Sequence, residues 1–263
     1  MSPVLRLSRT SDTPTRVGSI ALRDAGVSAR AHRYAGVPGM ALVVVPDGSA
    51  VPTPEHFHVW SRALVDHGFT SMRTGALSPR QAEQAERAGL RCVQELALLE
   101  LSASAMTLGP GHDAIVPQRR THRLRKRHLP TIAQIDHAAF GPSWWLDERM
   151  LADVRAATPM HRARTVRAGQ AGGDGNDIVG FLISGRAGRT GYVQRLAVHP
   201  DAHRQGIAND LLSDSLRWMR HARLQRAFVN THVDNVAALA LYRAHGFVEL
   251  PERLRVFEGP TPL

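Results

Sequence analysis

The sequence predicts a mixed α/β fold made of two related halves. Three observations support this prediction. Strand-like and helix-like segments alternate along the chain, two distant stretches match each other without a gap, and a basic connector separates them. Such alternation is typical of helices packed on a mixed sheet. At 263 residues, the chain is long enough for one large domain or two small ones.

The composition is that of an ordinary globular protein. With 43% hydrophobic and 21% charged residues, the chain is neither collagen-like nor wholly disordered. The apolar runs Met40–Val45 and Val236–Tyr242 are far shorter than the roughly 20 residues of a membrane span, so we expect no membrane partner. Met1–Arg16 lacks the apolar core of a secretory signal, and the single cysteine, Cys92, has no internal disulfide partner. We therefore expect a cytoplasmic protein.

The net charge of +10 comes almost entirely from arginine. Of the 33 basic residues, only Lys126 is a lysine. This bias is typical of GC-rich coding, so the charge by itself favours nucleic acid or a phosphate-bearing cofactor only weakly.

A break in the apolar periodicity marks the boundary between the halves. The break extends from about Met106 to Pro130, and within it a Gly-Pro-Gly turn at Gly109–Gly111 precedes a basic run, Gln118–His128. We expect an N-terminal half over residues 1–110, a basic linker over 111–128 and a second half over 129–263.

The two halves match in sequence order. Aligning Thr74 with Thr231 also aligns Gly89 with Gly246, without a gap. Each copy reads as strand, helix, glycine break and strand. This predicts an internal duplication, that is, a tandem repeat.

Periodicity predicts the remaining elements. In the first half we expect strands at Ala41–Val45 and Val93–Leu101 and a helix beginning near Pro54. In the second half we expect helices near 132–140 and 146–154, strands at 162–168, 177–184 and 192–199, a hairpin loop at 169–176, a helix at 206–223, a strand at 227–231, a helix at 236–245 and a closing pair of strands ending at Phe257.

A glycine at the start of the helix near residue 206 is the sharpest chemical signal. The strand Leu196–Val198 leads through a short loop to Gly206. Glycine lets a backbone approach a ligand closely, and the free amides of a helix N-terminus favour phosphate. Arg204 adds a fixed positive charge. The alternative is that Gly206 only makes a tight turn.

A second signal lies on the helix near 236–245. Asn235, Ala238 and Tyr242 are spaced i, i+3 and i+7, which places an amide, a small residue and a phenol on one face. Asn235 also suits a helix N-cap. The alternative for Tyr242 is an ordinary core residue of an amphipathic helix.

Together, three blocks resemble the acyl-CoA-binding core of the GNAT N-acetyltransferase superfamily. The resemblance extends over about residues 128–257, is most specific over 192–247, and implies the GNAT acyl-CoA N-acyltransferase fold with acetyl-CoA as co-substrate. We expect no metal, because the histidine pairs His56/His58 and His199/His203 lack further ligands at supporting spacings. The blocks are Leu196-Ala197-Val198-His199-Pro200, His203-Arg204-Gln205-Gly206-Ile207-Ala208, and Asn235-Val236-Ala237-Ala238-Leu239-Ala240-Leu241-Tyr242-Arg243-Ala244-His245-Gly246-Phe247.

The resemblance also implies which residues bind the co-substrate. The strand Leu196–Val198 would lie beside the pantetheine arm, the loop amides would hold the diphosphate, and Tyr242 would lie near the thioester sulfur. The family prefers Gln or Arg where this chain has His203, which we expect to weaken diphosphate binding without abolishing it. The implied binding residues are Leu196, Ala197, Val198, His203, Arg204, Gln205, Gly206, Ile207, Ala208, Asn235, Ala238 and Tyr242.

The implied reaction is direct attack of an amine on the thioester. We assign Tyr242 as the catalytic general acid for the thiolate and a backbone amide near Val198 as the oxyanion donor. Gln194 cannot act as a base. His232 is a candidate base, and a water chain or an acceptor amine that is already neutral are alternatives.

The acceptor would be a primary amine on a small molecule or a peptide. By resemblance it would bind at Phe140–Glu148, where Trp144 and Trp145 would wall a pocket and Asp147 or Glu148 would attract a cation. The alternative is a hydrophobic staple followed by an acidic helix start.

The first half lacks the chemistry of the second. It has Ser78 and Ala85 where the second half has Asn235 and Tyr242, so we expect a degenerate GNAT-like half that packs against the second. Alternatives to the acetyltransferase are a mycothiol-synthase-like enzyme, a non-catalytic CoA-sensing protein, or a nucleic-acid-binding protein using Arg119–His128. That basic run has no interleaved aromatic residues to stack on bases, which disfavours nucleic acid.

Overall fold

The computed structural model describes residues 19–34, 37–45, 50–108, 118–141, 144–168 and 177–263. The predictions for Met1–Arg16, for the Gly109–Gly111 turn and for the loop at 169–176 lie outside the described residues. No helix in the described ranges is long and apolar enough to cross a membrane.

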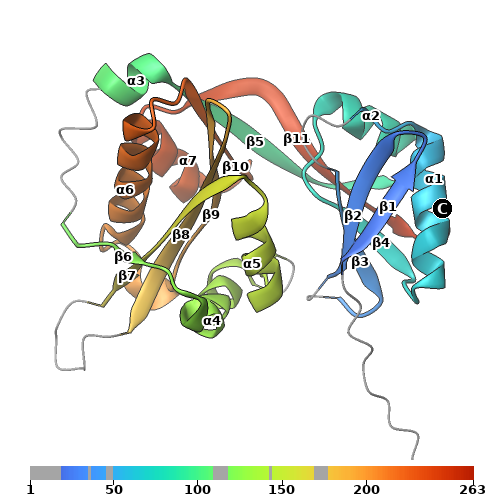
Figure 1. The fold of residues 1–263 in the computed structure, drawn as a ribbon, viewed down its shortest axis with the longest axis horizontal. Helices are drawn as coiled ribbons and strands as arrows, with labels where there is room; N and C mark the ends of the chain where they lie inside the picture. The colour runs from blue at the N-terminus through green and yellow to red at the C-terminus, as the bar shows by residue number, and fades with distance from the viewer. Residues whose placement is uncertain (1–18, 35–36, 46–49, 109–117, 142–143, 169–176) are drawn as a thin grey trace, which may run out of the picture.

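The described strands form one mixed sheet of eleven, in the order β1-β2-β3-β4-β11-β5-β10-β9-β8-β7-β6. Pairs β3/β4 and β9/β10 are parallel and the others are antiparallel. In Figure 1, β5 and β11 run from one half of the molecule to the other. The predicted mixed α/β class is confirmed.

The N-terminal half contains five strands and three helices among its described residues. They are β1 (Ile20–Asp24), β2 (Val27–Arg33), β3 (Met40–Val44), α1 (Pro54–Asp66), β4 (Ser71–Thr74), α2 (Pro79–Arg87), β5 (Arg91–Ser102) and α3 (Ala103–Leu108). The sequence analysis did not predict the β1–β2 hairpin.

The C-terminal half follows the same order with two additional helices before its first long strand. It consists of β6 (His122–Arg123), a 3-10 turn (Lys126–His128), α4 (Leu129–Phe140), α5 (Glu148–Ala156), β7 (Met160–Arg167), β8 (Ile178–Ala187), β9 (Thr190–Val198), a 3-10 turn (Pro200–Ala202), α6 (Ile207–His221), β10 (Arg226–His232), α7 (Val236–Ala244) and β11 (Val248–Pro260).

The gap-free repeat is visible in the structure. Helices α2 and α7 are both nine residues long, and the alignment of Thr74 with Thr231 matches their first residues and the first residues of β5 and β11. Gly89 and Gly246 both end a helix with left-handed backbone, at φ +87° and +84°. Such a conformation favours glycine after a helix.

The halves exchange their last strands. β5, which ends the first repeat, pairs with β10, and β11, which ends the second, pairs with β4. β5 and β11 also pair with each other. The C-terminal residue accordingly lies in the N-terminal half, where the Leu263 amide donates to Ser61 Oγ of α1 at 2.6 Å. Each half therefore completes its sheet with a strand from the other.

The closing segment differs from its prediction. We expected a pair of strands ending at Phe257, but β11 is a single strand from Val248 to Pro260. Its register with β5 shifts between Glu249 and Arg253. Pro251 lies in this irregular stretch, where its missing N–H costs no regular ladder bond, and the strand continues past it.

Helices cover both faces of the C-terminal part of the sheet. α6 and α7 pack on one face in a core that includes Leu211 and Tyr242. α4 and α5 pack on the opposite face around Ile132 and Leu151. In the N-terminal half, α1 and α2 cover one face of the sheet. A small cluster of Tyr34, Met40 and Met150 joins the halves.

Candidate functional site

The parallel strands β9 and β10 separate partway along their length. They pair only where Thr190–Tyr192 lies beside Arg226–Phe228. Beyond that point β9 continues to Val198 and β10 to His232, and β10 stays paired with β5 on its other edge. A register shift in the β8/β9 ladder places Gln194 outside regular pairing where the strands begin to separate. A bulge of this kind bends a strand, so a wedge opens between β9 and β10.

The end of β9 directs main-chain groups into this wedge. The His199 amide donates to the Val179 carbonyl at 2.8 Å, which makes His199 a bonded position of the antiparallel β8/β9 ladder. Bonded positions alternate, so the amides of Leu196 and Val198 point away from β8, toward β10. His203 Nε2 lies 3.1 Å from the Val198 carbonyl oxygen and donates to it. The Val198 N–H then remains a donor that faces the wedge, near its open end.

The loop that follows β9 has two left-handed residues. Arg204 has φ +59° and Gly206, the N-cap of α6, has φ +76°. A Cβ on Gly206 would have open space, its closest neighbour 3.9 Å away, so the backbone conformation and not crowding favours glycine here. Turns of this kind, at the start of a helix, point successive amides outward and suit an anion.

The basic linker lies against this loop, which sequence reasoning missed. The Gln118 amide donates to Asp210 Oδ1 at 2.8 Å, and the Arg119 guanidinium donates to the Gln205 carbonyl. Arg119 also pairs with Asp210 Oδ2 at 3.7 Å, and the Asp210 side chain is only 1% exposed. An aspartate among the apolar residues that open α6 was the available signal, because a buried carboxylate needs a partner.

Tyr242 lies where the wedge meets the helices. It shares a core with Val198 and Ile207, and its ring meets the Phe247 ring edge-on at a centroid distance of 5.8 Å. Burial raises the pKa of the Tyr242 hydroxyl above its usual value, only partly offset by the charge of Arg195. The hydroxyl therefore stays protonated at neutral pH.

The other predicted residues of α7 have local roles. Asn235 caps the helix, its Oδ1 accepting the Ala238 amide at 3.1 Å, as predicted. Ala238 packs against the same core as Leu196 and Ala208. Gly206, Leu196 and Tyr242 thus belong to neighbouring elements around one wedge.

His232 lies at the end of β10, across the sheet from Tyr242. Val229 faces the α6/α7 core, so alternation places His232 on the α4/α5 face. Its Nδ1 accepts the Asp234 amide at 3.1 Å. The neutral ring then carries its proton on Nε2, and it can accept another proton only if the bond from Asp234 breaks.

The predicted acceptor segment is fixed by a buried ion pair. Arg195 of β9 pairs with Asp136 of α4 at 2.7 Å, and Asp136 is fully buried. Arg195 also donates to the Trp144 carbonyl, and Asp136 accepts the Leu146 amide at 2.6 Å. Asp147 caps α5 by accepting the Met150 amide at 2.7 Å, so the predicted acidic helix start is present.

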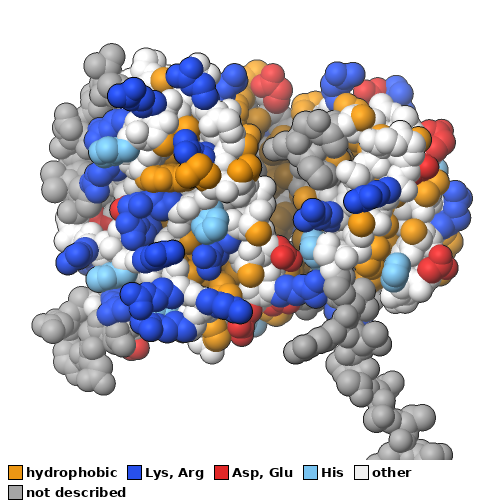
Figure 2. Space-filling model, viewed as in Figure 1, with side chains coloured by type: hydrophobic (Ala, Val, Ile, Leu, Met, Phe, Trp, Pro, Cys, Tyr) orange, Lys and Arg blue, Asp and Glu red, His pale blue; other side chains and the backbone are white. Residues whose placement is uncertain are grey.

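The N-terminal half reaches this segment. The Arg73 guanidinium of β4 lies 4.5 Å from the centre of the Trp144 ring and 5.5 Å from that of Tyr34. Arg73 also pairs with Glu258 of the exchanged strand β11. Figure 2 shows a hollow between the two halves on the face that bears α4 and α5. Side chains from both halves thus meet at Arg73 and Trp144.

The corresponding part of the N-terminal half is closed. β3 and β4 pair along the full length of β4, from Met40/Ser71 to Val43/Thr74. Ser78 and Ala85 hold the places of Asn235 and Tyr242, and Ala85 is fully buried. α1 begins after Thr53, whose backbone is extended, with φ −91°. The described first half therefore has neither the wedge nor the glycine turn.

Comparison with known proteins finds a family match within the second half. Residues 132–247 match the family model described as the acetyltransferase (GNAT) family. A stretch of 71 residues is 34% identical to N-alpha-acetyltransferase 30 of Schizosaccharomyces pombe (strain 972 / ATCC 24843), over 27% of this chain and 47% of that protein. The match thus spans about half of that relative.

Two solved structures share the whole arrangement. A tandem GNAT protein from the clavulanic acid biosynthesis pathway superposes with a TM-score of 0.60 at 16% identity, over 91% of this chain and 81% of that one. A GCN5-related N-acetyltransferase from Kribbella flavida superposes with a TM-score of 0.58 at 12% identity, over 93% and 90%. At these identities the likeness concerns the fold.

Proposed function

This chain carries a domain of the acetyltransferase (GNAT) family, and from that premise we propose that it transfers an acetyl group from acetyl-CoA to a primary amine by direct attack on the thioester. One observation carries the proposal. The wedge between β9 and β10 ends at the left-handed loop that caps α6, so a strand edge and a set of anion-binding amides lie in line.

The residues present fit acetyl-CoA along this line. The outward-facing amide of Leu196 would bond the pantetheine arm as a neighbouring strand would, which leaves the Val198 amide for the reacting thioester. The loop from His203 to Gly206 and the first turn of α6 would hold the diphosphate, with Arg204 adding charge.

Two donors would act on the reacting thioester. The Val198 N–H would stabilise the oxyanion of the tetrahedral intermediate as the new C–N bond forms. As the C–S bond breaks, the Tyr242 hydroxyl would meet the departing thiolate. A thiol has a pKa of about 8.5, below that of a buried phenol, so Tyr242 acts best as a hydrogen-bond donor that keeps its proton.

The amine must lose a proton during the attack. His232 remains our candidate base, on the α4/α5 face from which the amine would approach. Its present bond from the Asp234 amide must open for that role, so the alternatives are a water chain that carries the proton to solvent and an acceptor amine that is already neutral.

The acceptor would enter the hollow between the halves. Trp144 contacts both halves, since Arg195 of the C-terminal half donates to its carbonyl and Arg73 of the N-terminal half lies over its ring. The proposed task of the N-terminal half is therefore to form one wall of the acceptor site. The amine belongs to a small molecule or a peptide.

The proposal is tested with the full chain in two steps. Calorimetry should detect acetyl-CoA binding, and Gly206→Val should weaken it about tenfold, because a β-branched residue at positive φ costs about 1–2 kcal/mol and displaces the loop. Gly68→Val is the matched control. Gly68 also has positive φ, at +79°, and open space, but lies after α1.

Thiol release across a panel of amines is the second step. Acetylation of an amine, measured as free CoA and as acetylated product, supports the transferase. Acetyl-CoA binding with no turnover on small amines or peptides indicates a non-catalytic CoA-binding protein, and no binding at all contradicts the proposal.

A further inference from the structure

A cavity of about 410 Å³ lies on the side of α6 that faces the linker and β7. It adjoins the loop before α6, because Arg119 lines the cavity and also contacts Gln205. We call it the linker cavity. Its lining residues are Arg119, Arg120, Thr121, His122, Arg123, Arg164, Asp210, Asp214 and Arg217.

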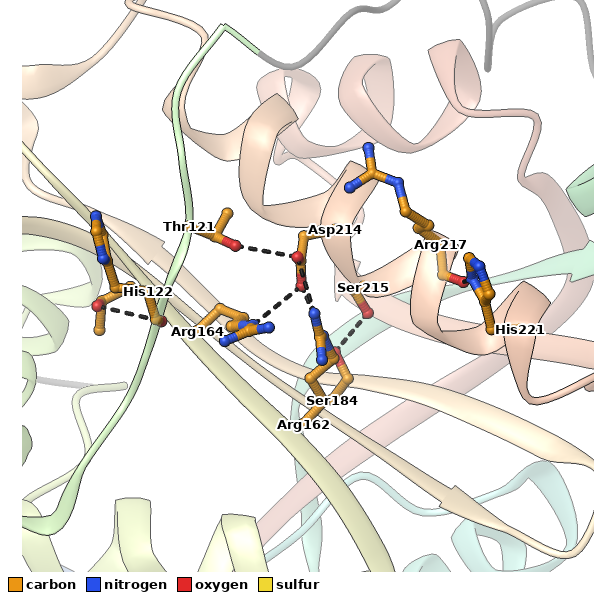
Figure 3. A network of polar contacts seen from close by, with 10 residues as sticks. Thr121, His122, Arg162, Arg164, Ser184, Asp214, Ser215, Arg217 and His221 are labelled. Atoms are coloured by element: carbon orange, nitrogen blue, oxygen red, sulfur yellow. Dashed lines mark hydrogen bonds and ion pairs between the residues drawn. The ribbon is translucent and has the colours of Figure 1, made fainter.

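Both carboxylates of the linker cavity already have partners. Asp214 accepts two hydrogen bonds from Arg162, at 2.7 and 3.0 Å, one from Arg164 at 3.3 Å and one from Thr121 at 3.0 Å. Figure 3 shows these groups converging on Asp214. Asp210 Oδ1 accepts the Gln118 amide, and Asp210 Oδ2, which has no hydrogen bond within the described residues, forms an ion pair with Arg119 at 3.7 Å.

Three arginines of the cavity remain without an acidic partner. Arg120, Arg123 and Arg217 make no side-chain hydrogen bond or ion pair with any residue in the described ranges. The guanidinium of Arg217 lies apart from the network around Asp214 (Figure 3). The linker cavity therefore holds more positive charge than its own carboxylates neutralise.

The surplus positive charge also acts on His122, which lines the linker cavity. The pKa of His122 is lowered, first by burial and then by the charges of Arg167, Arg120 and Arg164. An anion placed among these guanidinium groups would offset the arginine charges and so raise the pKa of His122.

We propose that the linker cavity binds a phosphate monoester. Such a group carries about −1.5 to −2 charges at neutral pH, which matches the surplus of guanidinium groups. Arginine presents paired N–H donors that fit phosphate oxygens. The phosphate has two possible sources: the ribose 3′-phosphate of coenzyme A bound at the adjoining loop, which rests on the proposed function, or a phosphate on a separate molecule.

The first experiment compares acetyl-CoA with acetyl-dephospho-CoA, which lacks only the 3′-phosphate. If the coenzyme supplies the phosphate, the full chain should bind acetyl-CoA about tenfold more tightly, and Arg123→Gln with Arg217→Gln should remove that preference. Both arginines are exposed, so the variant should fold. Arg80→Gln, an exposed arginine on α2, should keep the preference.

The second experiment titrates inorganic phosphate and follows the ring resonances of His122 by NMR, assigned with His122→Gln. If the phosphate belongs to a separate molecule, addition of phosphate should raise the pKa of His122, with and without saturating acetyl-dephospho-CoA. The Arg123→Gln, Arg217→Gln variant should lose this response, and Arg80→Gln should keep it.

The outcomes separate the two proposals. Failure to bind acetyl-CoA would contradict the proposed function. The phosphate titration needs no coenzyme, so it would still test the phosphate site. Two readouts are compared between the wild type and the double variant: the preference for the 3′-phosphate and the phosphate-dependent change in the pKa of His122. If neither readout differs, the proposed phosphate site is wrong.

Discussion

Tyr242 is the residue on which turnover should depend most. We propose that its hydroxyl donates to the departing thiolate, and burial keeps that hydroxyl protonated. Tyr242→Phe should lower kcat about a hundredfold, because one donor to a developing charge is lost. Acetyl-CoA affinity should change little. Thiol release under saturating substrates measures the effect.

The thermal midpoint of Tyr242→Phe serves as the control, since removing one hydroxyl should leave the packing with Phe247 in place. An unchanged kcat in a folded variant would remove Tyr242 from the mechanism. Because the pKa of Tyr242 lies above its usual value of about 10, any activity change between about pH 6 and pH 9 must come from another group.

Arg119 and Asp210 form a second residue-level test. Without Arg119, the buried carboxylate of Asp210 would face the diphosphate loop with only the Gln118 amide as partner. Arg119→Gln should therefore weaken acetyl-CoA binding about tenfold through electrostatic repulsion. Adding Asp210→Asn should restore most of the affinity. Calorimetry on both variants checks this, and a double variant no better than the single one would mean that Arg119 acts in another way.

At the scale of elements, Asp214 joins α6 to β7 and to the linker. Burial alone would raise the pKa of Asp214, but hydrogen bonds from Arg162 and Thr121 and the nearby arginine charges outweigh burial and lower it. A pKa that is lower in the folded state contributes stability above the unfolded value of about 4, and that contribution is lost as the pH falls through the folded value.

Asp214→Asn should accordingly destabilise the protein by about 1–3 kcal/mol near pH 7. The difference from wild type should shrink below about pH 4, where the wild-type carboxylate also becomes protonated. Urea unfolding at both pH values measures this. A difference that does not depend on pH would show that lost packing, and not charge, is responsible.

At the scale of the molecule, strand exchange should make folding a joint property of the halves. Each half lacks the strand that completes its sheet, because β5 lies beside β10 and β11 beside β4. The full chain should unfold in urea in one transition. Residues 129–263 alone would leave the open edge of β10 unpaired, so we expect aggregation or partial folding.

Circular dichroism and size-exclusion chromatography of the isolated half check this expectation, and co-expression with residues 1–128 should restore a folded complex. A stable, monomeric 129–263 fragment would contradict it. The proposed division at residues 111–128 would then describe independent domains as well as sequence repeats.

Local features of the site follow from the sequence. The left-handed turn at Gly206, the Asn235 cap and the matching helices α2 and α7 depend on contacts within a few residues, and sequence periodicity and turn chemistry report such contacts directly. The same signals placed β9, α6 and α7 in order, and the resemblance to the GNAT family then brought Leu196, Gly206 and Tyr242 into one prediction.

Only the tertiary structure decided how those elements meet. β5 and β11 have equivalent places in the repeat, and no local pattern tells a strand which half it will join, because pairing is chosen by long-range hydrogen bonds and packing. The separation of β9 from β10, the Arg119–Asp210 contact and the clamp of Arg195 and Asp136 on Trp144 each join residues far apart in the chain. The sequence determined the strand, the glycine turn and the helices that form the wedge. Long-range strand pairing and packing decided which residues of the linker and of the other half lie around it.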